Sequence, residues 1–317
     1  MTNSDDHAIV VEDLTKRYGD LRVVDGVSFN VNKGEVFAFL GPNGAGKTTT
    51  VEIIETIRVP TSGKVRVLGM DVTTRKRDIV PRIGVLPQGF SSFDRLSVRE
   101  TIQYYSRLFG RRDTDVDGLV ALAHLRDKSD VQFKRLSGGL KQRLGIAISL
   151  VNDPEVVFLD EPTTGLDPHA RRAVWDVLLD LKTKGKTVFL TTHYMEEAEL
   201  LADTVAIISK GRLVAMDAPE VLIKRHANYM CLTLNAVDAT ALQTIRRMKF
   251  APVQDTRQNV TIRVTSAEEV REILSAITTA GTPLPGLSVR GPTLEEVFLG
   301  LTGERLHEVT PAVGGAA

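Results

Sequence analysis

The chain has 317 residues, of which 42% are hydrophobic and 25% are charged, and its formal net charge at pH 7 is zero. These values are typical of a globular protein with one α/β domain of ordinary size and a smaller second domain. No basic excess indicates nucleic-acid binding, so we expect no nucleic-acid partner. The single cysteine, Cys231, excludes a disulfide framework and favours a reducing compartment.

The two ends of the chain are predicted to be unstructured. Residues 1–7 are polar and acidic and lack the features of a signal peptide, and residues 306–317 are rich in glycine and alanine. No apolar run approaches the roughly 18 residues that a membrane helix needs.

A glycine-rich loop lies between a predicted strand, Val36–Leu40, and a predicted helix, Thr49–Ile57. This order is the context that a phosphate-binding G-x-x-x-x-G-K-T loop requires, which disfavours the alternative of a turn that binds nothing. Glycines let backbone N–H groups face the phosphates, Lys47 supplies a cation, and Thr48 can place its hydroxyl on Mg²⁺. The predicted nucleotide-binding residues here are Gly41, Pro42, Asn43, Gly44, Ala45, Gly46, Lys47, Thr48 and Thr49.

The next part of the chain begins with a hairpin around Gly63 and Gly69 and a strand at Ile83–Leu86, and then becomes more helical. The predicted helices are Arg99–Phe109, Val116–Leu125 and Leu140–Val151. Four aromatic residues in this part either fill its core or line a groove, and the sequence leaves both alternatives open. They are Phe90, Phe93, Tyr104 and Tyr105.

A second apolar strand, Val156–Leu159, ends in Asp160 and Glu161. Open α/β sheets bind ligands at the carboxyl ends of their strands, so these two carboxylates are expected beside the phosphates. Asp160 is the candidate ligand for Mg²⁺ and Glu161 is the candidate general base for the attacking water.

The pattern changes after a short helix that ends near Lys224. Residues 229–305 then predict the order β-α-β-β-α-β of a small ferredoxin-like α+β domain. The strands are expected at Tyr229–Leu234, Pro252–Thr256, Asn259–Val264 and Leu287–Arg290, and the helices at Asp238–Met248 and Ser266–Thr279. A closing helix, Thr293–Thr302, has an apolar face that docks either on the first domain or on a partner.

These motifs, in this order, closely resemble the nucleotide-binding subunit of an ABC transporter over residues 8–225. The segment that makes the resemblance specific is Leu-Ser-Gly-Gly at the start of a predicted helix, which is similar to the family's signature. The resemblance implies a P-loop NTPase fold with a helical subdomain at about 89–151. The signature residues are Leu136, Ser137, Gly138 and Gly139.

The resemblance also assigns roles to further residues. Tyr18 matches the aromatic that stacks on adenine, and its alternative is a core tyrosine at a strand end. Gln88 matches the glutamine that senses Mg²⁺ and water, and His193, after the strand Thr187–Thr191, matches the switch histidine at the γ-phosphate. The loop that contacts the opposite subunit corresponds to Gly165, Leu166 and Asp167. The Mg²⁺ ligands that it implies are Thr48, Gln88 and Asp160.

The resemblance implies an ATPase that uses ATP and Mg²⁺. Each chain carries one phosphate loop and one signature, so a complete site needs a second ATPase subunit, and a homodimer is the simplest choice although a heterodimer stays open. A separate integral membrane permease completes the transporter and holds this subunit at the cytoplasmic face of the membrane. Leu140, where the family most often has Gln, is the one visible departure in the signature.

The C-terminal segment Gly291–Leu299, with Leu301–Gly303, resembles subunits for antibiotic resistance and for export of drugs or lipids. This shorter match favours an exporter. An importer subunit, a soluble ABC ATPase acting on nucleic acid or ribosomes, and an ATP sensor without turnover remain alternatives. The sequence does not name the transported molecule.

Overall fold

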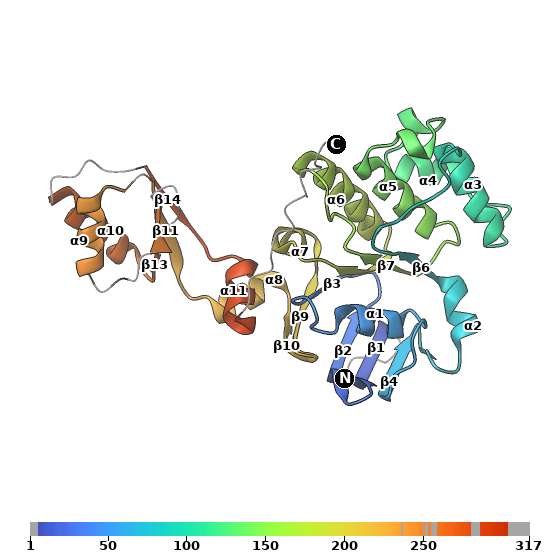
Figure 1. Ribbon diagram of the computed structural model, residues 1–317, viewed down its shortest axis with the longest axis horizontal. Helices are drawn as coiled ribbons and strands as arrows, with labels where there is room; N and C mark the ends of the chain where they lie inside the picture. Colours follow the sequence, from blue (N-terminus) through green and yellow to red (C-terminus); the bar gives the residue numbers. More distant parts are fainter. Residues whose placement is uncertain are drawn as a thin grey trace. The chain divides into compact units, whose positions relative to one another are not determined.

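The computed structural model describes residues 6–235, 237–248, 250, 253–254, 259–279 and 286–303 (Figure 1). The chain divides into two compact units. Among the described residues, unit 1 runs to Pro219 and also includes Thr302 and Gly303, and unit 2 lies within Glu220–Leu301. Of the ends that were predicted to be unstructured, residues 1–5 and 306–317 lie outside the described residues, as does the predicted turn at Gln258, whereas His7 begins the first strand.

The central element of unit 1 is a six-stranded sheet with the order β10-β9-β3-β8-β7-β6. The five strands from β9 to β6 are parallel to their neighbours, and β10 is antiparallel at the edge. Apolar runs form the inner strands because both of their faces are covered. The strands are β3 (Val36–Leu40), β6 (Ile83–Leu86), β7 (Val156–Asp160), β8 (Thr187–Thr191), β9 (Thr204–Ser209) and β10 (Arg212–Asp217).

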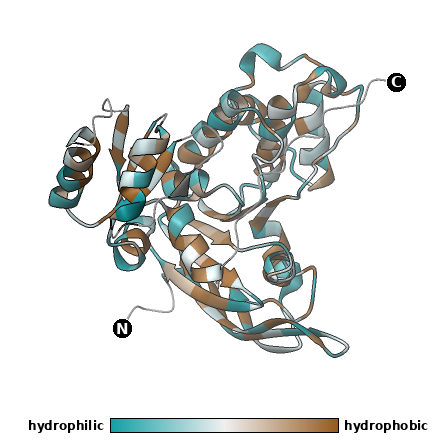
Figure 2. Ribbon diagram, turned by 60° about the vertical axis from the view of Figure 1, so that its left-hand side comes forward, coloured by the Kyte–Doolittle hydropathy of each residue, from teal (hydrophilic) through white to brown (hydrophobic). Residues whose placement is uncertain are grey.

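A second sheet of unit 1 is antiparallel, with the order β2-β1-β4-β5. It shares one apolar core with the first sheet and with helix α1 (Lys47–Ile54), and the hydrophobic residues follow the strands in Figure 2. Phe29 of β2 stacks on Phe37 of β3 with ring centroids 5.2 Å apart, which fixes the two sheets against each other. The strands are β1 (His7–Tyr18), β2 (Leu21–Asn32), β4 (Ser62–Val67) and β5 (Met70–Asp71).

Helices form the rest of unit 1. The helical subdomain has its own buried cluster, to which α3, α4 and α5 contribute. Trp175 of α6 is buried among apolar residues on the other face of the six-stranded sheet. The helices are α2 (Lys76–Ile79), α3 (Val98–Leu108), α4 (Val116–Leu122), α5 (Gly138–Ser149), α6 (Pro168–Thr183) and α7 (Met195–Leu201). Short 3₁₀ turns occur at 80–82, 126–128 and 133–135.

The helix ends differ from the predicted ones for local reasons. Helix α1 ends at Ile54, three residues early, because Thr56 takes a left-handed φ of 66°. Helix α4 ends at Leu122 because His124 has a φ of 53°. Helix α5 begins at Gly138, two residues early, because the Ser137 side chain caps it by accepting from the Leu140 N–H.

Unit 2 has the element order β-α-β-β-α-β, and its sheet is antiparallel with the order β12-β13-β11-β14. Its elements are β11 (Met230–Leu234), α9 (Ala239–Arg247), β12 (Val253–Gln254), β13 (Val260–Val264), α10 (Ala267–Thr279), β14 (Leu287–Arg290) and α11 (Leu294–Thr302). As expected, Ser266 accepts a hydrogen bond from the Glu269 N–H at the start of α10. The division between the units falls inside α8 (Pro219–His226), so most of this helix belongs to unit 2, whereas the sequence assigned it to the first domain.

Among the described residues, no helix has both the length and the apolar character needed to span a bilayer.

Candidate functional site

The glycine-rich loop joins the end of β3 to the start of α1, as predicted. Gly46 precedes α1 with a φ of 99°, and a Cβ placed there would lie 2.7 Å from the Val23 carbonyl oxygen. Both the dihedral angle and this close approach require glycine at that position. Helix α1 therefore begins at Lys47, with its N-terminal N–H groups directed at the loop.

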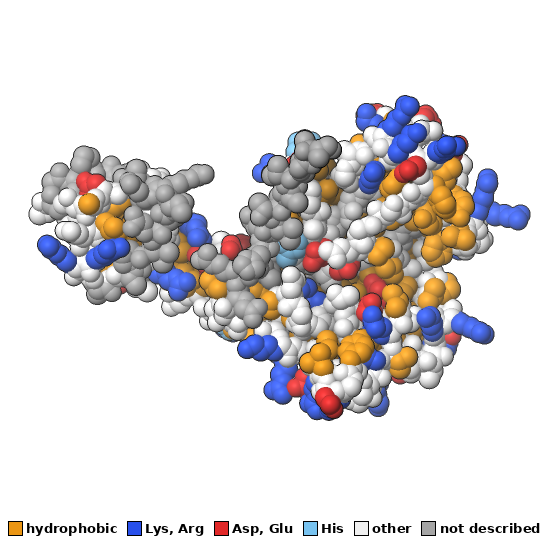
Figure 3. All heavy atoms as spheres, in the orientation of Figure 1, with side chains coloured by type: hydrophobic (Ala, Val, Ile, Leu, Met, Phe, Trp, Pro, Cys, Tyr) orange, Lys and Arg blue, Asp and Glu red, His pale blue; other side chains and the backbone are white. Residues whose placement is uncertain are grey.

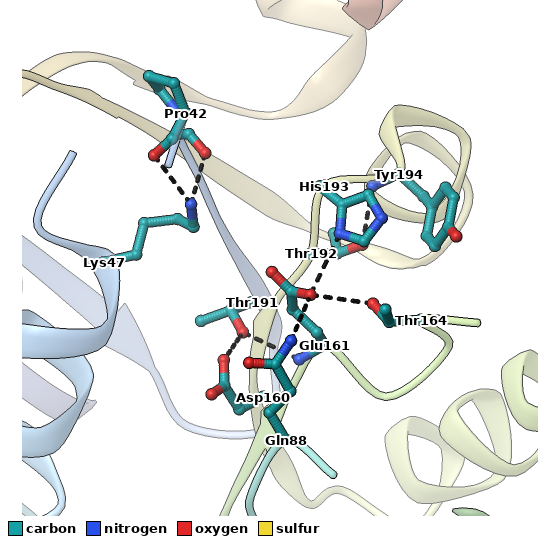
Figure 4. A network of polar contacts seen from close by, with 11 residues as sticks. Pro42, Lys47, Gln88, Asp160, Glu161, Thr164, Thr191, Thr192, His193 and Tyr194 are labelled. Atoms are coloured by element: carbon teal, nitrogen blue, oxygen red, sulfur yellow. Dashed lines mark hydrogen bonds and ion pairs between the residues drawn. The ribbon is translucent and has the colours of Figure 1, made fainter. Parts of the chain in front are cut away.

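The Lys47 side chain is folded onto its own loop. Its ammonium donates to the carbonyl oxygens of Gly41 at 2.6 Å and Pro42 at 3.1 Å (Figure 4). Burial lowers the pKa of Lys47, and the nearby carboxylates of Glu161 and Asp160 partly oppose that effect. A buried cation whose hydrogen bonds go to carbonyl oxygens is well placed to bind an anionic phosphate.

Asp160 and Glu161 lie side by side at the end of β7. The Asp160 carboxylate accepts a hydrogen bond from the Thr191 hydroxyl of β8. Burial raises the pKa of Asp160, and the charge of Glu161 acts in the same direction. The Glu161 N–H donates to the Thr191 carbonyl oxygen at 3.1 Å, which ties the ends of the two strands together.

Three donors from three parts of the chain converge on one oxygen of Glu161. Oε2 accepts from Gln88 Nε2 at 3.1 Å and from Thr164 Oγ1 at 3.0 Å, and it lies 3.3 Å from Nδ1 of His193 (Figure 4). The hydrogen bond of His193 is the largest cause that lowers the pKa of Glu161, so the ionised form is favoured. Glu161 also has a left-handed φ of 48°, a strained conformation of the kind found at functional sites.

His193 uses one ring nitrogen toward Glu161 and keeps the other for a further contact. Within the described part of the chain, its Nε2 is buried and has no hydrogen-bond partner. The ring packs on Tyr194 at 4.2 Å between centroids, and the Arg171 guanidinium lies 3.8 Å from the centre of the Tyr194 ring. The imidazole is therefore held in place while Nε2 remains able to bind a ligand oxygen.

A buried acid that the sequence did not predict, Glu197, lies four residues after His193 in the chain. Glu197 of α7 is fully buried and accepts a hydrogen bond from Trp175 Nε1 at 3.0 Å. Burial raises its pKa, and the hydrogen bond from Trp175 opposes the rise. Its helix follows His193 in the chain, so this buried acid lies close in sequence to the histidine that contacts Glu161. The only signal in the sequence is its i, i+4 spacing to the buried Leu201.

The signature residues and the predicted dimer-contact loop lie against each other. A Cβ on Gly138 would lie 3.4 Å from the Leu166 side chain, and a Cβ on Gly139 would lie 2.8 Å from Cβ of Ala170. Asp167 caps α6 by accepting from the N–H groups of His169 and Ala170. Leu136 and Gly139 are buried, Ser137 and Gly138 are exposed at the N-terminus of α5, and Gly165 is exposed.

These residues do not meet the phosphate loop. Among the described residues, no hydrogen bond or ion pair joins the signature to the loop that carries Lys47. Tyr18 ends β1 with 41% of its surface exposed, and the cations of Lys16 and Arg58 lie 5.2 and 5.8 Å from its ring centre. An exposed ring with cations beside it can stack on a planar ligand.

The oxygen ligands available to a divalent cation are few. The described residues contain no group of three His, Cys, Asp or Glu side chains that could hold a metal ion. Thr48 is exposed at the start of α1, and Asp160 and Gln88 lie at the ends of neighbouring strands. Such a sparse oxygen set fits Mg²⁺, which keeps several waters and shares the oxygens of a substrate phosphate.

The chain is similar to several known proteins. The ABC transporter family profile matches residues 24–164. The Nod factor export ATP-binding protein I of Rhizobium etli is 38% identical over 307 residues, which cover 95% of each chain. That of Rhizobium sp. strain N33 is 39% identical over 306 residues, which cover 95% of this chain and 99% of the relative. Among solved structures, cbiO1 from Clostridium perfringens, part of the ABC transporter complex cbiONQ, aligns with a TM-score of 0.63 and 27% identity, over 69% of this chain and 91% of that one.

Proposed function

Because this chain belongs to the family of ABC transporter ATP-binding subunits, which hydrolyse ATP to power transport, we propose that it is the motor subunit of a two-component exporter. In this proposal two copies close around ATP and Mg²⁺ and drive a separate membrane permease. The observation that carries it is the convergence of Gln88, Thr164 and His193 on one oxygen of Glu161, next to Asp160 and the loop of Lys47.

The proposed hydrolysis uses Glu161 as the base. A water between Glu161 and the γ-phosphate gives its proton to the carboxylate while its oxygen attacks phosphorus. The bond from phosphorus to the β–γ bridging oxygen breaks, and ADP takes the electron pair. Lys47 stabilises the charge on the phosphate oxygens, and the free Nε2 edge of His193 would contact the γ-phosphate.

Thr48, Asp160 and Gln88 would hold Mg²⁺, which neutralises phosphate charge when it is bound. The raised pKa of Asp160 fits this role, because a carboxylate whose charge is uncompensated gains most from a nearby cation. Tyr18 would stack on the adenine base. Glu161, His193 and Gln88 are the proposed catalytic residues.

A second subunit would complete each site. Ser137 and Gly138 are exposed at the N-terminus of the 12-residue helix α5, where N–H groups and the helix dipole favour an anion. These groups have no phosphate loop beside them in the same chain, so the proposed dimer places them on the γ-phosphate of the partner copy. Gly165, Leu166 and Asp167, which lie against the signature, would then form the contact between the two copies.

The permease is proposed to bind a groove beside Gln88, which holds the subunit at the cytoplasmic face of the membrane. The groove has a volume of about 490 Å³ and is lined by residues that include Phe90, Tyr105 and Phe109. Phe109 is 48% exposed. Tyr104 on α3 and Phe93 before this helix are also exposed. Figure 3 shows hydrophobic side chains gathered on this side of unit 1, around α3. An amphipathic helix could cover them.

Export is the proposed direction because two relatives that align over nearly the whole chain are named as export proteins. The proposed cargo class is a drug, an antibiotic or a lipid-like molecule. Residues 229–305 are proposed to be a ferredoxin-like accessory domain beside an ATPase domain at 8–225, whose helical subdomain is 89–151. The strand order β12-β13-β11-β14 of unit 2 supports this assignment.

Two experiments test the proposal. Glu161→Gln keeps the shape of the side chain but cannot accept a proton, so it should bind ATP, hydrolyse it at least tenfold more slowly and accumulate as a dimer. Hydrolysis by this variant at the wild-type rate would refute the assignment of the base.

The second experiment is purification of the tagged chain from its native membranes with mass spectrometry of the bound proteins. The proposal expects a polytopic membrane protein in near-equal amount. Ribosomes or nucleic acid in its place would favour the soluble-ATPase alternative. Vesicles reconstituted with the purified complex then distinguish an exporter from an importer.

A further inference from the structure

The groove beside Gln88 contains one acidic residue, Glu55, in a largely apolar wall. The wall is formed by side chains from β6, from the segments before and after it, and from α3 and α5. Its main apolar residues are Val80, Leu86, Phe90, Tyr105, Phe109 and Ile148. Glu55 lines the same groove and is only 7% exposed. A carboxyl group in such surroundings is costly unless it is paired.

Glu55 has no partner among the described residues. No hydrogen bond or ion pair is made by its carboxyl group, and its charged neighbours are the acids Asp160 and Glu52. Burial, followed by the charges of those two acids, raises the pKa of Glu55 to about 8. Oγ1 of the next residue, Thr56, is fully buried and has no hydrogen-bond partner. The Glu55 oxygens also lack a partner but are not fully buried. The carboxyl group therefore opens onto the groove.

The nearby cations of the chain do not neutralise Glu55. Arg58 is paired with Glu52. Lys76 lines the same groove but is exposed, and within the described residues it forms no ion pair with Glu55. The backbone after Glu55 is strained, since Thr56 is β-branched and has a φ of 66°. A strained turn and an unpaired buried acid both lower stability, and such destabilising features occur together at functional sites.

We propose that Glu55 pairs with one lysine or arginine of an amphipathic helix of the membrane partner, and so selects which helix this groove accepts. This inference rests on the proposed function of the chain as a permease-bound subunit. The apolar wall covers the non-polar side of the helix, and Glu55 requires one basic side chain at a fixed place along it. A helix that lacks that cation leaves the acid buried and unpaired, which disfavours wrong partners.

The test compares the membrane subunit that is retained by four forms of the full chain. Wild type, Glu55→Gln, Glu55→Lys and Lys64→Gln are tagged, expressed in the native host and purified from detergent-solubilised membranes. Quantitative mass spectrometry measures the amount of membrane subunit per chain. Lys64→Gln is the matched control, because it removes a charge from an exposed side chain of β4 that does not line the groove. Far-ultraviolet circular dichroism of each form confirms that it is folded.

We expect wild type and Lys64→Gln to retain equal amounts within twofold, Glu55→Gln to retain about tenfold less, and Glu55→Lys to retain less still. A photo-crosslinking residue at Ile57, which lines the groove and is 61% exposed, identifies the bound helix. Changing its basic residue to glutamate should then restore the complex of Glu55→Lys.

Two results would overturn the inference while the proposed function stands. One is full retention by Glu55→Gln and Glu55→Lys. The other is a cross-linked helix without any basic residue. Absence of a membrane subunit from the wild-type purification would instead refute the proposed function itself, and the inference with it.

Discussion

Replacing Glu55 by glutamine should stabilise the isolated subunit, and the gain should depend on pH in a defined way. The carboxyl group has an ordinary pKa of 4.5 in the unfolded chain and a pKa of about 8 in the fold. The fold therefore binds its proton more tightly than the unfolded chain does. The stability that this proton provides is fully present below about pH 4.5 and is lost as the pH rises through about 8.

The size of the effect follows from the two pKa values. Each pH unit between them costs the folded state about 1.36 kcal/mol, so the loss is about 3 kcal/mol at pH 7 and up to about 5 kcal/mol above pH 8. Glutamine has nearly the same shape and never ionises, so Glu55→Gln escapes this loss. The variant and the wild type should therefore have nearly equal stability near pH 5 and should diverge steadily at higher pH.

Urea unfolding at several values between pH 5 and pH 8.5, without nucleotide or Mg²⁺, measures this difference. The only tryptophan of the chain, Trp175, is buried in unit 1, so its fluorescence reports the unfolding of the unit that contains Glu55. Other titrating groups act equally on both proteins and cancel in the comparison. Lys64→Gln is the control. A difference that stays constant with pH, or a wild type that is the more stable form at pH 8, would refute the reasoning.

Three further variants test the site. Lys47→Ala should lower ATP affinity at least tenfold in a calorimetric titration, because it removes the cation held at the phosphate loop; unchanged affinity would contradict the assignment of the loop. Trp175→Phe should destabilise the fold by about 1–3 kcal/mol, because it removes a donor from the buried Glu197; unfolding followed by circular dichroism measures this, and an unchanged midpoint would rule it out. Thr164→Val should move the acidic limb of the ATPase pH profile to higher pH. His193 is the main group that keeps the pKa of Glu161 low, and Thr164 adds to it, so losing this donor raises that pKa, while Thr164→Ser should restore the profile.

The sequence predicts those parts of the molecule that depend on neighbouring residues. Apolar runs gave the bounds of β3, β6 and β8, and the glycine-rich loop was found because its residues are consecutive. The order of elements in unit 2 followed from alternation and capping residues. In each case the cause of the structure lies within a few positions of its effect.

The parts that could not be predicted depend on residues far apart in the chain. Nothing near Glu55 shows that it lines an apolar groove without a partner, since the walls come from α3, α5 and β6. Glu197 is equally ordinary in sequence beside the exposed Glu196 and Glu199, and only packing against Trp175 distinguishes it. Thr164 was missed because its hydrogen bond to Glu161 depends on a left-handed turn at a non-glycine residue.

The positions of the three donors on Glu161 depend on the register of the strands in the six-stranded sheet, so the rate of hydrolysis should depend on that register too. Gln88 follows β6, Glu161 and Thr164 follow β7, and His193 follows β8, and these strands end level with one another, with Leu86 opposite Leu159 and Asp160 opposite Thr191. A shift of one strand by a single residue would move its donor by about 3.3 Å, which is as large as the contacts of 3.0 to 3.3 Å that these donors make with Glu161. Phe158 of β7 and Phe189 of β8 are buried and their rings pack together, so substitutions there should affect the rate of hydrolysis as well as stability.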